Sequence, residues 1–454
     1  MERGICIVVI AHNEQKLVWQ QLDRLASFRQ PDGCHVVIVD NGSQDGLAQS
    51  LKEQNEIDYI LCEGGIENYA AILNTVVSEF AAKEDLLVLP PHLLILEEGV
   101  SRLKKALYQD GATGAVCAGS YAADPLRGKQ RELLSLEAGA CLLSAKLLQA
   151  TGGFNESLKL PENIWMDLSF RGICSGFHFY EVPDACVQQA AQACNSYTKK
   201  YGADADRETL KKIWGMNYFN QYPNVSLLSM IGKKKTEPFA LLEIGCDCGA
   251  NMMYVKNTFQ AASLTGIEIN ENAAKIAAQT AKVHVCDIEA GLPDFGNTKF
   301  DYVVFGDVLE HLKDPERILR ECASVLKSDG EILACIPNLM HYSVLHGLLH
   351  GNFTYMDTGL LDRTHIHFFT YNEIVKMFVR NGYAIEKVLY TGQKETVSSQ
   401  EKAFVDGLRR LGSGTEEFMY YAFQYLVSAK TVKTAKTAAS AIRSLTSGGL
   451  KDGS

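Results

Sequence analysis

The sequence has no apolar run of the roughly 20 residues that a helix needs to cross a bilayer. Positive charge is also scarce, because 44 Lys and Arg residues stand against 54 Asp and Glu residues and leave a formal net charge of −10. A chain of this charge lacks the broad basic surface that binds nucleic acids. Residues 5–10 form an apolar run of strand length, without the charged start or small-residue cleavage site of a signal peptide. We expect no transmembrane segment, no nucleic-acid partner and a cytoplasmic location.

Regular cysteine spacing is absent as well. The 13 cysteines are scattered singly, and the spacing of Cys246 and Cys248 matches neither a zinc site nor a disulfide framework. Reduced thiols in a cytoplasm are the simplest account of this pattern.

The chain of 454 residues is too long for one ordinary hydrophobic core, which predicts two domains. In the first part, apolar runs of strand length alternate with longer amphipathic stretches. The clearest runs are residues 5–10, 36–40, 57–61 and 86–89. This alternation predicts an α/β domain with a largely parallel sheet over residues 1–200.

A second α/β series follows a polar connector of helical pattern at residues 201–237. Its strand-like runs are residues 239–244, 264–267, 283–285, 302–305 and 331–336. Helical patterns separate these runs, as a doubly wound, Rossmann-like sheet requires, and the domain is predicted to span residues 238–392. Residues 393–454 have the pattern of a helical or flexible tail, and the basic residues near its end favour either a solvated terminus or a surface-binding helix.

Small and acidic residues mark the strand ends of this second domain. The strand at 239–244 runs into Gly245 and Gly249, where a side chain would obstruct a ligand lying against the strand end. Glu268 ends the next strand, a position from which a carboxylate accepts hydrogen bonds from two ribose hydroxyls. Asp287 ends the third strand and is placed to accept from an adenine amine. Together these residues predict a site for a nucleoside cofactor.

Residues 239–390 resemble the class I S-adenosylmethionine-dependent methyltransferases, close to the branch that methylates sugars and quinone precursors. The resemblance implies that S-adenosylmethionine is the cofactor. The predicted cofactor-binding residues are Glu243, Gly245, Gly249, Glu268, Asp287 and Asp307. Asp247 departs from the family, since many members carry glycine there. A dinucleotide dehydrogenase shares this fold, but the chain shows no second mononucleotide half and no hydride-transfer constellation.

The acceptor side is predicted from histidines. Methyl transfer to a hydroxyl needs an oxygen in line with the sulfonium and a group that removes its proton. His311 follows the fourth strand, and residues 359–370 resemble the segment that related sugar methyltransferases place over the acceptor. The candidate general bases are His311, His365 and His367, of which the last two are alternatively structural partners of backbone carbonyls.

A metal site is a further hypothesis for the acceptor side, because His341, His346 and His350 lie close together in the sequence. No carboxylate stands at ligand spacing from them except Asp357 and Asp362. We therefore expect no divalent metal ion.

The amino-terminal domain resembles family 2 glycosyltransferases of the GT-A fold. The resemblance rests on residues 5–14 and 36–46 and on the later segments 138–144 and 151–156. It implies that Asp40 and the end of the first strand, with Glu14, hold the base of a sugar nucleotide. Asp167 is the third candidate for this nucleotide-sugar site.

The catalytic positions of that family are altered here. Where the family has metal-binding aspartates after the fourth strand, this chain has Pro90, Pro91 and His92. The pair that supplies the general base falls on Ile164 and Trp165. Two prolines and a histidine do not replace carboxylate ligands to the metal that neutralises a diphosphate. Glu162 remains nearby as a base, and a late histidine ligand falls near Gln188 or Gln189.

The sequence therefore predicts an S-adenosylmethionine-dependent methyltransferase acting on a sugar or glycan hydroxyl, fused to a glycosyltransferase-like domain that has lost its usual chemistry. A bifunctional glycosyltransferase–methyltransferase and a non-catalytic scaffold for glycan assembly stay open. The expected partners are a sugar or glycan acceptor and, if binding is retained, a sugar nucleotide. Dimerisation through the first domain, giving a homo-oligomer, is a further alternative.

Overall fold

The structure of the chain is a computed structural model that divides into two compact units, Met1–Gln221 and Tyr222–Ser454. It describes residues 3–27, 33–54, 57–62, 67–119, 130–183, 186–192, 196–202, 204–216, 220–392, 394–412 and 415–432. Within these ranges, no helix combines the length and the apolar character that a bilayer crossing demands. Of the predicted basic tail, Lys430 is described and the residues after 432 lie outside the described ranges.

The first unit is built on a mixed sheet of eight strands in the order β3-β2-β1-β4-β8-β6-β9-β7. Its strands are β1 Ile5–Ala11, β2 Cys34–Asp40, β3 Asp58–Leu61, β4 Asp85–Val88, β6 Thr113–Ala118, β7 Arg131–Leu133, β8 Cys141–Leu143 and β9 His178–Val182. A small antiparallel pair is formed by β5 (Leu93–Ile95) and β10 (Val187–Gln189). The four predicted strands are confirmed and run parallel. The prediction of a largely parallel sheet is not confirmed, because the sheet is mixed: β8 runs antiparallel to both β4 and β6.

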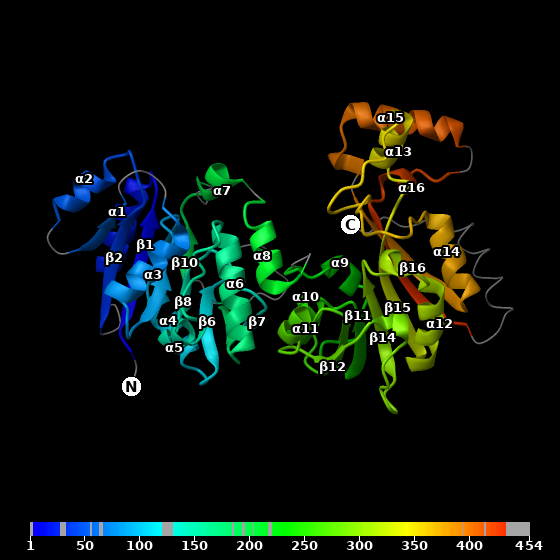
Figure 1. Cartoon of the computed structure of the whole chain (residues 1–454), viewed down its shortest axis with the longest axis horizontal. Helices are drawn as coiled ribbons and strands as arrows, with labels where there is room; N and C mark the ends of the chain where they lie inside the picture. Colours follow the sequence, from blue (N-terminus) through cyan, green and yellow to red (C-terminus); the bar gives the residue numbers. More distant parts are fainter. Residues whose placement is uncertain are drawn as a thin grey trace. The chain divides into compact units, whose positions relative to one another are not determined.

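Helices cover this sheet, and Figure 1 labels them along the blue to green part of the chain. They are α1 Gln15–Ser27, α2 Leu47–Lys52, α3 Tyr69–Glu79, α4 Gly99–Leu107, α5 Ala145–Thr151, α6 Pro161–Cys174, α7 Ser196–Tyr201 and α8 Arg207–Trp214. The strands β1 and β4 and the second half of β2 are almost fully buried, and this explains their continuous apolar runs.

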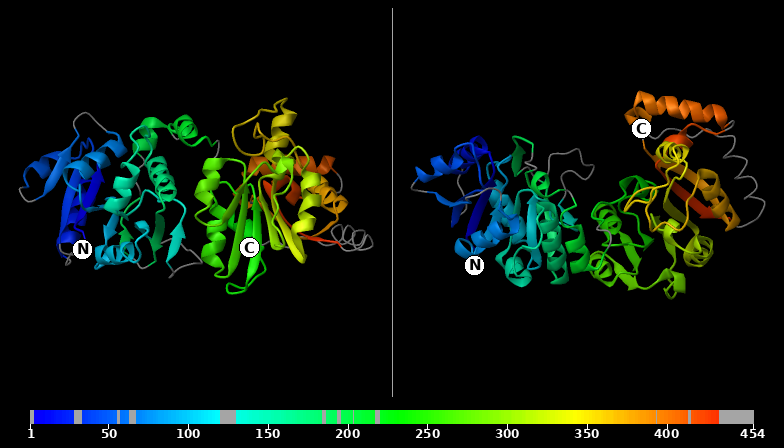
Figure 2. Two further views of the ribbon diagram at one scale, coloured as in Figure 1. Left: turned by 60° about the horizontal axis from the view of Figure 1, so that its bottom comes forward. Right: turned by 45° about the horizontal axis from the view of Figure 1, so that its top comes forward.

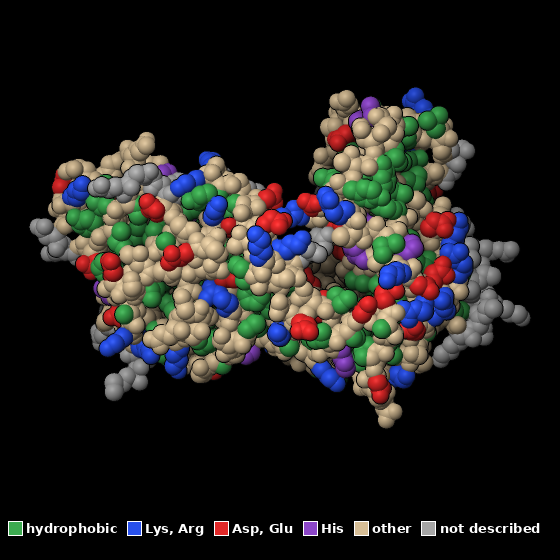
Figure 3. Space-filling view, viewed as in Figure 1, with side chains coloured by type: hydrophobic (Ala, Val, Ile, Leu, Met, Phe, Trp, Pro, Cys, Tyr) green, Lys and Arg blue, Asp and Glu red, His purple; other side chains and the backbone are tan. Residues whose placement is uncertain are grey.

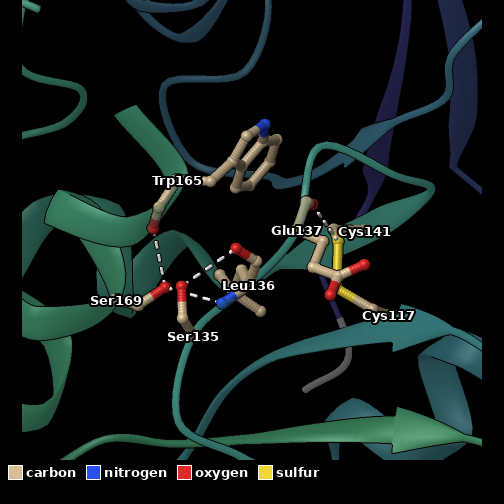
Figure 4. The surroundings of a disulfide bond; sticks show 7 residues. All are labelled: Cys117, Ser135, Leu136, Glu137, Cys141, Trp165 and Ser169. Carbon is tan, nitrogen blue, oxygen red and sulfur yellow. Dashed lines mark hydrogen bonds between the residues drawn. A yellow bond between two sulfur atoms is a disulfide. The ribbon is translucent and has the colours of Figure 1, made fainter. Parts of the chain in front are cut away.

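Two cysteines of this unit are joined, so the prediction of reduced thiols is wrong for them. Cys117 in β6 and Cys141 in β8 are register partners, with their Cα atoms 4.2 Å apart, and they form a disulfide. Figure 4 shows the bridge beside residues 135–137, where the Leu136 N–H donates to Ser169 Oγ of α6 at 2.9 Å. The pairing depends on strand register, which spacing in the sequence does not reveal.

The second unit has a sheet of seven strands in the order β13-β12-β11-β14-β15-β17-β16. Its strands are β11 Phe239–Ile244, β12 Ala262–Glu268, β13 Lys282–Val285, β14 Phe300–Gly306, β15 Leu326–Pro337, β16 Tyr383–Thr391 and β17 Gln424–Thr431. All five predicted strands are present and run parallel to one another. The order reverses between β11 and β14, which is the place where doubly wound sheets bind ligands. The left view in Figure 2 shows the green to yellow strands of this sheet side by side.

Helices lie on both faces of the second sheet. They are α9 Val225–Leu228, α10 Ala250–Thr258, α11 Glu271–Ala277, α12 Pro315–Val325, α13 Tyr342–Leu349, α14 Tyr371–Arg380, α15 Ser399–Leu411 and α16 Phe418–Tyr421, with 3-10 turns η1 Ile288–Ala290, η2 Leu309–His311 and η3 Lys394–Thr396. The residues of β11 pack alternately into two hydrophobic cores, one on each face of the sheet. Leu242 and Ile244 pack on one side, while Phe239 and Leu241 pack on the other.

The predicted tail differs most from the structure. Residues 399–411 are helical, as expected, but β17 lies inside the sheet, antiparallel to both β15 and β16. Its residues Tyr425, Leu426 and Val427 are at most 1% exposed. The strand is central and buried on both faces, so it has no polar–apolar alternation that would reveal it. The predicted connector differs too, because Leu227 and Leu228 pack into the core of the second unit.

The disulfide leads to a first prediction. Peptide mapping of protein purified without reductant is expected to find Cys117 linked to Cys141, and replacing both with alanine is expected to lower the free energy of unfolding by about 3 kcal/mol for a closed loop of this size. Cys174→Ala, which removes an exposed thiol of the same unit, is the matched control. The pairing would be refuted if only unlinked peptides were recovered.

Candidate active site

The glycine turn after β11 shapes one side of the site. Gly245 has a φ of +69°, and a β-carbon there would lie 2.6 Å from Val308 Cγ2. Gly249 has a φ of +91°, and its β-carbon would lie 3.1 Å from Ala277. These positions require glycine through backbone conformation and packing. That a side chain here would also obstruct a ligand stays a prediction from the sequence.

Glu268 lies where the sequence predicts it. It ends β12, beside β11, and is 8% exposed. Its Oε2 accepts a hydrogen bond from the Asp247 N–H at 2.9 Å, and its Oε1 accepts from the Asn270 N–H at 2.8 Å. Asp247 has a φ of +46°, in the left-handed region that favours glycine. The carboxylate is therefore fixed against the glycine turn, and each oxygen keeps a second lone pair for a ligand.

Glu243 is a deeply buried acidic residue. It lies in β11, is 2% exposed, and its Oε1 accepts from Asn251 Nδ2 at 2.7 Å. Its Oε2 is buried and has no hydrogen-bond partner among the described residues. Burial raises the pKa of this carboxyl to about 8, and the charges of Asp247 and Glu268 add to the shift. A buried acceptor without a partner fits a cationic donor such as the ammonium of an amino-acid cofactor.

Two further aspartates stand at neighbouring strand ends. Asp287 follows β13, is exposed, and accepts from the Glu289 N–H at 2.8 Å. Asp307 follows β14 with a φ of +57° and accepts from Gln424 Nε2 of β17 at 2.6 Å. Glu243, Glu268 and Asp287 thus come from three adjacent parallel strands. A row of acceptors at one sheet edge fits the ammonium, ribose hydroxyls and adenine amine of S-adenosylmethionine.

Glu310, which the sequence analysis did not single out, is central to the acceptor side. It lies in η2, is fully buried, and neither carboxylate oxygen has a hydrogen-bond partner among the described residues. Burial, followed by the charge of Asp307, raises the pKa of this carboxyl well above its ordinary value. The Glu310 carbonyl oxygen accepts from the N–H groups of Ile366 and His367 at 2.9 and 3.0 Å. These bonds attach residues 366–367 to the end of β14.

The structure brings two of the three predicted bases together. The rings of His311 and His365 lie 4.9 Å apart, and His365 Nε2 is 4.0 Å from Glu310 Oε1. His311 Nδ1 lies 3.2 Å from the Thr364 carbonyl oxygen, and His365 Nδ1 lies 3.3 Å from the Leu360 carbonyl oxygen. Burial, followed by His311, lowers the pKa of His365. We refer to Glu310, His311 and His365 as the histidine cluster.

The other predicted histidines lie elsewhere. His367 Nε2 is 3.3 Å from the Lys313 carbonyl oxygen, and its ring lines a separate pocket with Arg320. His346 and His350 stack on each other in and after α13, and His341 caps the start of that helix.

Aromatic side chains accompany the segment that carries His365. Phe353, Tyr355 and Phe368 contact one another with ring centroids 5.5–6.4 Å apart. Phe353 is 38% exposed and Tyr355 is 51% exposed. Figure 3 shows hydrophobic side chains gathered on the part of this unit that carries α13 and α15. The chain thus offers an exposed apolar surface on the acceptor side.

The first unit holds a pocket of about 250 Å³ at the carboxyl ends of β1 and β4. Its lining includes Glu14, Pro90, Pro91, His92 and Glu162. Burial raises the pKa of the Glu14 carboxyl and lowers that of the His92 imidazole. Of the altered positions, Pro90, Pro91 and His92 therefore line a cavity, whereas Ile164 and Trp165 are fully buried.

Two of the predicted nucleotide-sugar residues are buried and hydrogen-bonded within the unit. Asp40 is 3% exposed, and its carboxylate accepts from the Ser43 N–H at 2.9 Å. Asp167 is fully buried, and its two oxygens accept from Arg171 Nε at 2.8 Å and Trp214 Nε1 at 3.0 Å. Of the three predicted residues, Glu14 lines the pocket.

Comparison with known proteins agrees with the two folds. The profile described as "Methyltransferase domain" matches residues 216–388, and that described as "Glycosyl transferase family 2" matches residues 6–166. An uncharacterised protein of Methanocaldococcus jannaschii is 27% identical over 177 residues, 38% of this chain and 68% of that protein. A mannosyltransferase structure from Pyrobaculum calidifontis is 20% identical, with a TM-score of 0.36, and the match covers 44% of this chain and 60% of that one.

Two curated methyltransferases are also similar. The ubiquinone biosynthesis O-methyltransferase of Glaesserella parasuis is 29% identical over 119 residues, 24% of this chain and 47% of the relative. The tRNA 5-carboxymethoxyuridine methyltransferase of Escherichia coli is 30% identical over 115 residues, 25% of this chain and 39% of the relative. The chain spans about half or less of these two relatives.

The fold and the profiles together define the class. The carboxy-terminal unit is a methyltransferase domain, and the amino-terminal unit carries a family 2 glycosyltransferase domain. The chain therefore carries one domain of each kind, which confirms the resemblance stated from the sequence.

The buried Glu243 predicts how stability varies with pH. Its carboxyl has an ordinary pKa of 4.5 and a pKa of about 8 in the folded protein. Between these values the unfolded chain loses the proton while the folded chain keeps it, so stability should fall as pH rises from 4.5 to 8. In Glu243→Gln, urea unfolding of the cofactor-free protein should show a shallower fall. The exposed Glu271→Gln is the control, and equal slopes in wild type and Glu243→Gln would contradict the assignment.

Proposed function

We propose that this chain transfers a methyl group from S-adenosylmethionine to a hydroxyl of a sugar or glycan. The observation that carries the proposal is the row of buried or fixed acceptors at the carboxyl ends of β11, β12 and β13. Glu268 matters most, because its carboxylate is held against the glycine turn by the Asp247 N–H. The bound cofactor supplies an electrophilic methyl group on a sulfonium.

Different residues of the chain bind different parts of the cofactor. Glu268 accepts from the ribose hydroxyls through the lone pairs that the backbone leaves open. Asp287 accepts from the adenine amine at the exposed end of β13. The unpartnered Oε2 of Glu243 accepts from the ammonium, which compensates an otherwise unpaired buried oxygen. Asp307 borders the site at the end of β14.

The acceptor hydroxyl must lose its proton as the methyl group arrives, and the histidine cluster is the group available for that step. Val308 packs against the glycine turn, and η2 with Glu310 and His311 follows it directly. The cluster therefore stands beside the cofactor site. Its pair of histidines is favoured over His367, which lines a different pocket.

A sugar or glycan acceptor is supported by two features. The exposed rings of Phe353 and Tyr355 offer flat apolar surfaces to the apolar face of a sugar ring. The fused unit belongs to a family that handles sugar nucleotides. A tRNA acceptor, as in one relative, is less favoured because the net charge of −10 disfavours a polyanion.

We further propose that the amino-terminal unit no longer transfers sugar. The residues after β4 that face its pocket are Pro90, Pro91 and His92, and Asp167 is occupied by Arg171 and Trp214. The runner-up is a bifunctional enzyme in which Glu14 or Glu162, both at the pocket, serves a metal-independent transfer. Cytoplasmic location and a homo-oligomer remain proposals from the sequence.

Cofactor binding tests the first proposal. Isothermal titration calorimetry with S-adenosylmethionine should give saturable binding to wild type, weakened at least about 100-fold in Glu268→Ala, because two hydrogen bonds to a carboxylate are lost. Glu268→Gln should also bind weakly while it keeps the side-chain volume. Glu271→Ala, an exposed carboxylate three residues away, should bind as wild type does.

Thermal unfolding of the same four proteins shows whether weak binding results from a folding defect. This control is needed because the Asp247 and Asn270 N–H groups lose their acceptor in Glu268→Ala. If folded wild type takes up no S-adenosylmethionine, or if Glu268→Gln binds as tightly as wild type, the proposed cofactor site is wrong.

The state of the amino-terminal unit is tested separately. Incubation with a panel of nucleotide-diphosphate sugars, with and without Mn²⁺, should give no manganese-dependent release of nucleotide, because the end of β4 offers no carboxylate pair for the metal. Release that disappears in Glu14→Gln or Glu162→Gln would instead establish the bifunctional alternative.

A further inference from the structure

We propose that the histidine cluster binds one Zn²⁺ ion through Glu310, His311 and His365. The side-chain ligand atoms of these three residues all lie within 4.8 Å of one another. Zinc bonds of about 2 Å place neighbouring ligand atoms roughly 3–4 Å apart, so the side chains need to close by about 1 Å. The binding of the ion does not depend on the proposed function, whereas its catalytic role rests on the proposed function.

The two imidazoles are already oriented as zinc ligands. The Nδ1 atoms of His311 and His365 lie 3.2 and 3.3 Å from backbone carbonyl oxygens, those of Thr364 and Leu360. A ring that donates its Nδ1–H to a carbonyl has its Nε2 lone pair available, and zinc-binding histidines almost always make such a bond on their other nitrogen. His365 Nε2 is also the atom that lies 4.0 Å from the Glu310 carboxylate.

The carboxylate supplies an independent argument. Glu310 is fully buried, and both of its oxygens lack a hydrogen-bond partner among the described residues. A buried carboxylate in this state is costly unless it is protonated or faces a cation. Asp307 and Asp362, which interact with it electrostatically, are themselves acidic. A divalent cation would compensate this concentration of acidic groups.

The donor set selects the kind of metal. Two imidazoles and one carboxylate suit zinc better than Mg²⁺ or Ca²⁺, which prefer oxygen ligands. Two histidines and one glutamate with a fourth position left open are also the ligand set of catalytic zinc sites. The same three residues come from η2 and from residues 359–369, so the ion would hold the acceptor-side segment against the end of β14.

In the proposed reaction, the acceptor hydroxyl takes the fourth position. In this version of the proposed reaction, zinc would replace the free histidine base, because it would lower the pKa of the oxygen it binds and the hydroxyl proton would leave to solvent. The oxygen lone pair then forms the new O–CH₃ bond, while the electron pair of the S–CH₃ bond returns to sulfur. This yields the methylated acceptor and S-adenosylhomocysteine, and no oxidant or reductant is consumed.

The test uses the full chain, stripped with a chelator and dialysed. Titration with ZnCl₂, followed by calorimetry against a competing chelator, should show one tight site in wild type. His365→Ala and Glu310→Gln should weaken it by more than about 100-fold, because losing even a group behind a zinc ligand costs about 10–100-fold. His346→Ala, which breaks the exposed histidine pair of α13, should leave the tight site intact.

The absorption spectrum of bound cobalt(II) distinguishes this site from sites with cysteine ligands, for which the chain has many candidate residues. Co²⁺ bound at the histidine cluster should show visible d–d bands without a thiolate charge-transfer band, and the bands should vanish in His365→Ala. The proposal is overturned if wild type has no tight site, if the cobalt spectrum is that of a thiolate, or if His346→Ala and His365→Ala lose zinc alike. Calorimetry with S-adenosylmethionine is independent of these outcomes, so failure of the metal site and failure of the proposed function are distinguishable.

Discussion

The hydrogen bond from the Asp247 N–H to the Glu268 carboxylate is the contact on which the site depends. It joins the glycine turn after β11 to the end of β12, so two strands that are parallel neighbours also share one polar edge. The turn places Gly245 against Val308, and Val308 leads directly into η2. Cofactor side and acceptor side are therefore linked through a few residues at the tips of three strands.

Much of this arrangement could be predicted from the sequence because its signals are local. Apolar runs of strand length identify β11 to β15, and their parallel order brings Glu243, Glu268 and Asp287 to one edge of the sheet. The glycines were also recognised, because a tight turn after a strand uses them. The structure adds a reason of its own, since their positive φ angles and close packing disfavour a side chain.

What the sequence did not reveal depends on contacts between distant residues. The strand β17 lies between β15 and β16, and its buried run of apolar residues has no alternation to identify it. Cys117 and Cys141 meet through the register of β6 and β8. Glu310 approaches His365 because its own carbonyl oxygen binds the backbone of residues 366 and 367. No spacing rule in a single sequence encodes these three pairings.

The state of the buried carboxylates distinguishes the two units. In the first unit, both oxygens of Asp167 accept from donors of the protein itself, and the Asp40 carboxylate accepts from the Ser43 N–H. In the second unit, Glu243 keeps one buried oxygen and Glu310 keeps two without a partner among the described residues. Such oxygens cost stability unless the carboxyl is protonated or a bound cation or donor compensates them. This difference in hydrogen-bond satisfaction is the physical reason for assigning the chemistry to the methyltransferase unit.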